Sequence, residues 1–73
     1  MIHEYFKKEF DDFKLLVQLN PVNFTILELT VHSDDSVTKR KLEADEHIYE
    51  DLEEDDFEKS GPIEFNLYLK GIS

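Results

Sequence analysis

The apolar positions in the first quarter of the chain recur at helical spacing. Plotted at about 100° per residue, they fall on one arc, opposite a face of lysine, aspartate and glutamine. The arc contains Ile2, Tyr5, Phe6, Phe10, Phe13, Leu16 and Val17. This pattern predicts an amphipathic helix over residues 2–19. The helix is expected to end before Pro21, because proline disfavours helical geometry in the preceding residue.

The next segments have the composition of strands. Residues 24–32 are rich in β-branched and aromatic side chains that alternate with a period of two, which predicts a central strand. Residues 33–36 have a turn composition. Residues 37–43 are expected to return as a second strand with Lys39, Arg40 and Lys41 in its middle. Such charges suit an edge strand, which must avoid pairing with other chains.

A short helix and a third strand are expected in the C-terminal half. Asp45 is a suitable N-cap, and Ile48 and Leu52 form an i, i+4 apolar pair. The helix should stop near Glu54, because a longer helix would direct Phe57 away from the apolar side. Beyond Ser60, Gly61 and Pro62, apolar and polar residues alternate over 63–69, which predicts the third strand.

The resulting order, α-β-β-α-β, predicts one small α+β domain over residues 1–73. The expected fold is a two-layer sandwich with a three-stranded sheet in the order 2-1-3, because a hairpin joins the first two strands and a right-handed crossover leads to the third. The first strand is then central and antiparallel to its hairpin partner. Both helices cover one face of this sheet. The other face would expose a back-face patch of Phe24, Ile26 and Tyr68, through which a homodimer could form.

Composition limits the setting in which this chain works. The chain has no cysteine, so no disulfide framework supports its small core, and a reducing compartment is favoured. Its first residues lack the pattern of a signal peptide, and no apolar run approaches the ~20 residues of a membrane span. We therefore expect a cytoplasmic protein without membrane association.

The formal net charge of −10 has a local origin. Residues 43–58 contain ten acidic residues and no lysine or arginine, whereas the other eight acids are matched by eight basic residues. This acidic segment would repel the phosphates of nucleic acids and anionic lipids. Direct binding of DNA or RNA is therefore not expected.

The sequence contains no recognisable catalytic motif, and we expect neither an enzyme nor a cofactor. The three histidines lack ligand spacing, and two glycines cannot build a phosphate-binding loop. Glu9 lies within the apolar arc, where it is either buried beside Arg40 or His32 or overhangs the sheet into water. The acids at Asp34 and Asp35 and at residues 53–56 suggest weak divalent-cation association, but their spacing does not predict a defined metal site.

Three functions remain open. The first is a small non-catalytic interaction module that binds a basic surface of another protein, with a solubilising acidic face as the simpler alternative. Its partner-binding residues are expected to be Glu46, Tyr49, Glu50, Glu53, Glu54 and Asp56. The second is a DNA-mimic inhibitor of a nucleic-acid-binding protein. The third is a carboxylate enzyme or metal binder based on Glu9 or on Asp34 and Asp35.

Overall fold

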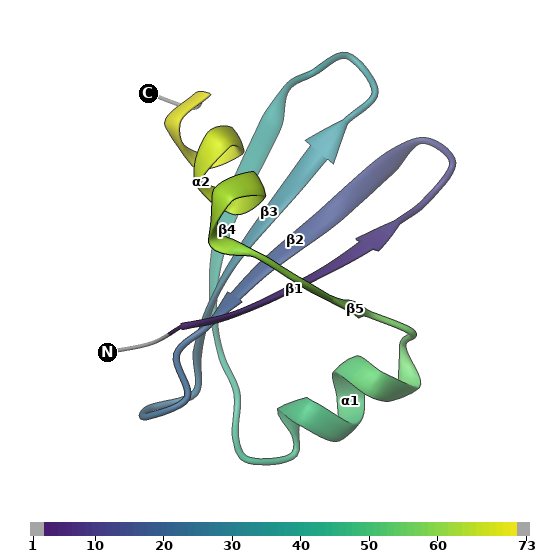
Figure 1. Ribbon diagram of the computed structural model, residues 1–73. Coiled ribbons are helices and arrows are strands. Elements are labelled where there is room, and N and C mark those ends of the chain that lie inside the picture. The colour runs from purple at the N-terminus through teal and green to yellow at the C-terminus, as the bar shows by residue number, and fades with distance from the viewer. Residues whose placement is uncertain (1–2, 72–73) are drawn as a thin grey trace.

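A five-stranded antiparallel sheet forms the centre of the computed structural model, which describes residues 3–71 (Figure 1). The strands are β1 (Glu4–Glu9), β2 (Phe13–Leu19), β3 (Thr25–His32), β4 (Val37–Glu43) and β5 (Glu58–Ser60). Their order in the sheet is β4-β3-β2-β1-β5. The first four strands form a meander, and β5 returns to pair with β1.

Two helices cover opposite faces of the sheet (Figure 1). Helix α1 (Ile48–Glu54) lies in the connection from β4, at one edge, to β5, at the other, and α2 (Pro62–Gly71) follows β5. The core beneath α1 contains Phe6, Val17, Leu19, Ile26 and Leu52. The core beneath α2 contains Leu16, Leu29, Val31 and Phe65.

The molecule is an α+β fold, but the predicted three-stranded sheet with two helices on one face is wrong. Residues 4–19 form the β1–β2 hairpin instead of a helix, and Ile2 lies outside the described residues. Because both sheet faces are covered, the consecutive residues Leu16 and Val17 are both buried. Two consecutive buried residues also occur on the apolar face of a helix, so the sequence pattern resembles that of an amphipathic helix. The hairpin turns at Asp11 and Asp12, where the Phe10 N–H donates to the Phe13 carbonyl over 2.8 Å.

The predicted third strand over residues 63–69 is also wrong, since this segment forms α2. Pro62 occupies the first helical position, where its fixed φ and missing N–H are tolerated. The i, i+4 pair Phe65 and Leu69 faces the sheet, whereas Ile63 and Leu67 are 77% and 67% exposed. The predicted strands over 24–32 and 37–43 are confirmed with one residue of difference, and α1 ends at Glu54 as expected.

A charged cluster helps to fix α2 on the sheet. The Glu64 carboxylate of α2 lies 3.6 Å from the Lys7 ammonium of β1 and 3.3 Å from the Lys14 ammonium of β2. The Lys14 ammonium also lies 4.4 Å from the centre of the Tyr68 ring. Burial acts to raise the pKa of Glu64, but the hydrogen bond from Lys14 and the charges of Lys14 and Lys7 together hold it below its usual value.

The helical assignment of residues 62–71 predicts which side chains stabilise the fold. Phe65→Ala should lower the free energy of unfolding by about 3–5 kcal/mol, because Phe65 is 1% exposed. Leu67→Ala should change it by less than about 0.5 kcal/mol, since Leu67 is mostly in water. Urea unfolding of both variants measures the difference. Equal losses from the two substitutions would instead support the alternating strand.

The Glu64 cluster predicts a loss of stability in acid. Its folded-state pKa lies below the unfolded value, so its contribution is fully present above the unfolded pKa of about 4.5 and is lost as pH falls through the folded pKa. Glu64→Gln should therefore flatten the decrease in melting temperature below about pH 4.5. Glu9→Gln is the matched control, because Glu9 is exposed and belongs to no described ion pair. Parallel pH profiles for the wild type and Glu64→Gln would contradict the assigned role.

Candidate functional site

Helix α1 carries an acidic surface. Leu52 is its buried residue, while the predicted partner-binding residues are all exposed: Glu46, Tyr49, Glu50, Glu53, Glu54 and Asp56. We call these six residues the acidic surface. Glu50, Glu53 and Glu54 line one shallow depression on it, whereas Glu46 lies in the turn before the helix and Asp56 just after it. Of the six predicted residues, Glu50, Glu53 and Glu54 therefore share one depression in the structure.

Tyr49 connects the acidic surface to the first strand. Its hydroxyl donates a hydrogen bond to the Glu4 carboxylate of β1, and this bond raises the pKa of Tyr49. Tyr49 is 38% exposed, so part of it remains accessible to another molecule. Sequence reasoning missed Glu4 as a neighbour of α1, because it expected Glu4 on a helix of its own.

A hollow of about 570 Å³ lies between α1, β1 and β5. Apolar side chains and carboxylates line it together, and one lysine joins them; the lining residues are Glu4, Phe6, Tyr49, Leu52, Glu53, Asp56, Phe57, Glu58 and Lys59. We call this feature the α1 hollow. Glu4, Glu53 and Asp56 outnumber Lys59 on the α1 side of this lining, while Glu58 lies opposite Lys7 and so belongs to the α2 side. The α1 hollow joins part of the acidic surface to apolar side chains.

The end of α1 is shaped by a Schellman motif, which turns the chain toward the α1 hollow. The Phe57 N–H donates to the Leu52 carbonyl over 2.9 Å, and the Asp56 N–H donates to the Glu53 carbonyl over 3.1 Å. Asp56 takes the left-handed conformation at φ 61°. Phe57 then packs against the core beneath α1, as the sequence predicted.

The start of α1 differs from the expected cap. His47 occupies the N-cap position without a capping side-chain bond. Asp45, the predicted N-cap, instead accepts the His47 N–H over 2.9 Å with its carboxylate. The aspartate therefore stabilises the turn before the helix. Aspartate commonly accepts a hydrogen bond from the backbone N–H two residues later in a turn, because its side chain is short.

The proposed back-face patch of Phe24, Ile26 and Tyr68 does not exist as one surface. Ile26 is 7% exposed beneath α1, whereas Tyr68 lies on α2 at the opposite face. Phe24 is partly buried in the turn before β3, with a left-handed φ of 59°. The prediction is wrong because it placed both helices on one face of the sheet and left the other face uncovered.

The remaining candidate residues make ordinary local contacts. Glu9 is exposed at the end of β1, while its possible partners contact other groups: Arg40 lies 3.3 Å from Glu28, and His32 Nε2 lies 2.9 Å from the Thr38 hydroxyl. Asp34 accepts hydrogen bonds from the Ser36 hydroxyl and N–H, which lower its pKa. Across residues 3–71, His, Asp and Glu side chains form no group of three arranged to hold a metal ion.

Neither helix of the described chain is long and apolar enough to cross a membrane. No family model, curated protein or solved structure matches this chain.

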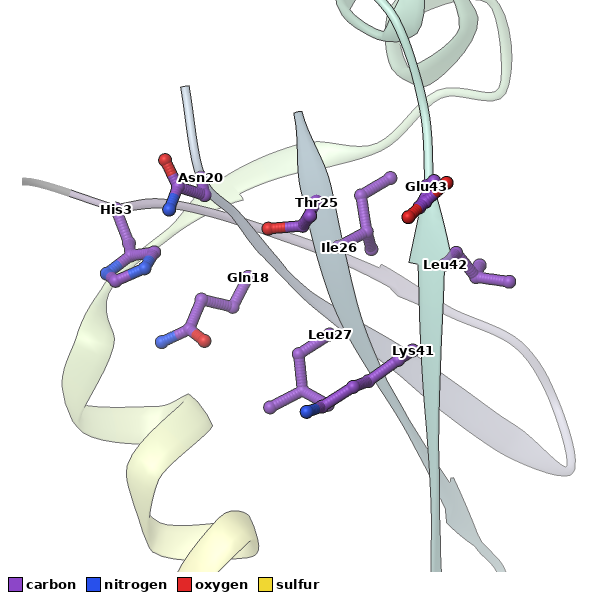
Figure 2. A pocket seen from close by; sticks show the side chains of 9 residues that line it. All are labelled: His3, Gln18, Asn20, Thr25, Ile26, Leu27, Lys41, Leu42 and Glu43. Atoms are coloured by element: carbon purple, nitrogen blue, oxygen red, sulfur yellow. The ribbon is translucent and has the colours of Figure 1, made fainter. Parts of the chain in front are cut away.

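A second concave region lies at the other end of the sheet from the hairpin turn of β1 and β2. It measures about 540 Å³ and is lined by residues of β2, β3 and β4 and by two residues next to strands, His3 and Asn20; the strand residues are Gln18, Thr25, Ile26, Leu27, Lys41, Leu42 and Glu43. Figure 2 shows the His3, Gln18, Leu27 and Lys41 side chains projecting to the same side. We call it the cross-strand pocket. Lys41 and Glu43 give it one charge of each sign, so it has no dominant charge.

The left-handed residue that ends α1 provides a test of this local geometry. Asp56→Gly should raise the free energy of unfolding by about 0.5–1 kcal/mol, because glycine adopts positive φ without a Cβ penalty. Asp55→Gly removes the same charge at φ −85°, where glycine gains nothing, and should be destabilising. Urea unfolding distinguishes the two. A lower stability for Asp56→Gly would contradict the motif.

Proposed function

We propose that this chain is a small non-catalytic interaction module that binds a basic segment of another protein at its acidic surface. The observation that carries the proposal is the α1 hollow, where carboxylates surround apolar side chains. A merely solvated helix would need no such hollow beside its charges.

The hollow suits a side chain that is apolar along its length and cationic at its end. Arginine and lysine have this form, and their stems pack on apolar surface while their charged groups stay near water or acids. The stem would pack on Phe57 and Tyr49, with the nearly buried Phe6 and Leu52 behind them. The charged group would meet Glu53 and Asp56 at the rim. Arginine is favoured over lysine, because its planar group bonds carboxylates in pairs and stacks on rings such as that of Tyr49.

The surrounding charge supports the same partner. Ten acids lie within residues 43–58, so a basic segment is attracted before contact is made. Concentrated charge of this kind increases association rates and selects partners by sign. The attraction falls with ionic strength, because salt screens exposed charges over about 8 Å at physiological concentration.

A peptide titration tests this proposal. A labelled peptide with two arginines separated by a leucine should bind the wild type, and its citrulline counterpart should not, as measured by fluorescence anisotropy. The double variant Glu53→Gln, Asp56→Asn should weaken binding by about tenfold, because it removes two rim charges at the hollow. Asparagine is tolerated in the left-handed conformation of residue 56, so the helix end is kept.

The matched control is Glu9→Gln with Asp12→Asn, which removes two exposed carboxylates elsewhere. Its affinity should stay within about twofold of the wild type, because exposed ion pairs contribute little. Equal weakening in both double variants would show attraction to net charge alone. An unchanged affinity in the variant Glu53→Gln, Asp56→Asn would show that the α1 hollow is not the binding site. Competition by duplex DNA for a protein captured at this surface would identify a nucleic-acid-binding partner.

A further inference from the structure

The outer edge of β4 has open main-chain hydrogen-bonding groups. β4 is the terminal strand of the sheet and pairs with β3 on its inner side. The inner bonds belong to even-numbered residues, since the Ala44 N–H donates to the Phe24 carbonyl and the His32 N–H donates to the Ser36 carbonyl. In an antiparallel pair the alternate residues direct these groups away. Residues 37, 39, 41 and 43 therefore present N–H and carbonyl groups outward, and no other strand within residues 3–71 pairs with them.

Basic side chains occupy the middle of this edge. Lys39 and Lys41 lie on the α2 face, in register with Leu29 and Leu27, and Arg40 lies on the α1 face. All three are exposed. Arg40 pairs with Glu28, but Lys39 and Lys41 make no ion pair or hydrogen bond with any residue that the structure describes. In a chain with 18 acids and eight bases, two lysines on one face without an ion pair leave a place for an external carboxylate.

We propose that the β4 edge binds an extended acidic peptide as an added strand of the sheet. The peptide backbone bonds to the open groups of residues 39, 41 and 43, which is the usual mode of strand addition. Its side chains then stand about 4.8 Å from those of β4, directly opposite them. Three successive acids on the peptide meet Lys39 and Lys41 on one face and Arg40 on the other.

Glu43 limits the length of the acidic run. It follows Lys41 on the same sheet face and lies beside it at the rim of the cross-strand pocket (Figure 2). A peptide carboxylate opposite Glu43 would be repelled, whereas an uncharged residue would not. The preferred ligand therefore has a short acidic run bounded by uncharged residues. A longer acidic tract should bind no better.

A charged edge strand also protects a sheet from unwanted pairing, and this protection is the alternative explanation for the three basic residues. The two explanations differ in their dependence on sign. Protection needs charge of either sign, whereas recognition of an acidic strand needs positive charge. Charge reversal of the two lysines separates them.

The test uses a labelled peptide of sequence Thr-Val-Glu-Glu-Glu-Val-Thr and its glutamine counterpart, at about 0.15 M salt, where the field of the acidic segment extends only about 8 Å. The acidic peptide should bind the wild type at least about tenfold more tightly than the glutamine peptide. Lys39→Glu with Lys41→Glu should weaken it by at least about tenfold. Lys8→Glu on β1, away from β4 and from the α1 hollow, is the control and should leave affinity within about twofold.

Amide hydrogen exchange of the complex provides the second readout. Binding as a strand should slow exchange at the outward amides of Lys39, Lys41 and Glu43, while the Arg40 amide, already bonded to β3, should change little. Unaltered exchange at the outward amides would overturn strand addition even if the peptide binds. Equal affinity of the charge-reversed variant would overturn recognition by the lysines and leave protection as their role.

Discussion

The burial of β2 on both faces is the constraint on which the structure depends. Leu16 points toward α2 and Val17 toward α1, and both are almost inaccessible to water. Each helix is attached to this sheet chiefly by one fully or nearly buried side chain, Leu52 on α1 and Phe65 on α2. A chain of this size has too little apolar surface to build two independent layers. It uses one strand to supply both cores, so damage to β2 weakens the support of both helices.

The same constraint explains which parts of the fold could be predicted. Strands β3 and β4 could be predicted for two reasons. Turn residues separate them at residues 33–36, and polar side chains occupy the middle of β4 because it is an exposed edge. The β1–β2 hairpin was not, since burial on both faces removes the period of two from Leu16 and Val17. Residues 63–69 alternate as a strand does, but Pro62 and the pair Phe65 and Leu69 favour the helix that forms there. Local pattern cannot decide between these forms when tertiary contacts select the buried side chains.

The candidate surfaces show the same division. Carboxylates around α1 are visible in the sequence, because the turn and the short helix keep them in water. The α1 hollow is not visible, since it needs Glu4 from β1 and Lys59 from β5 beside Tyr49. The basic residues of β4 were assigned to an edge strand from their charge alone, and the sheet order places them there. Acidic and basic surfaces thus occupy different parts of a small molecule.

The pairing of β5 with β1 has a consequence for the order of folding. The meander from β1 to β4 is built from hairpins between consecutive strands, whereas Tyr5 meets Ser60 only after almost the whole chain has been gathered. Contacts between distant residues carry a larger loop-closure entropy cost and form slowly. The hollow beside α1 takes its walls from both of these distant segments. During synthesis the chain therefore forms β4 early and the walls of the α1 hollow last, so a closed hollow is a mark of completed folding.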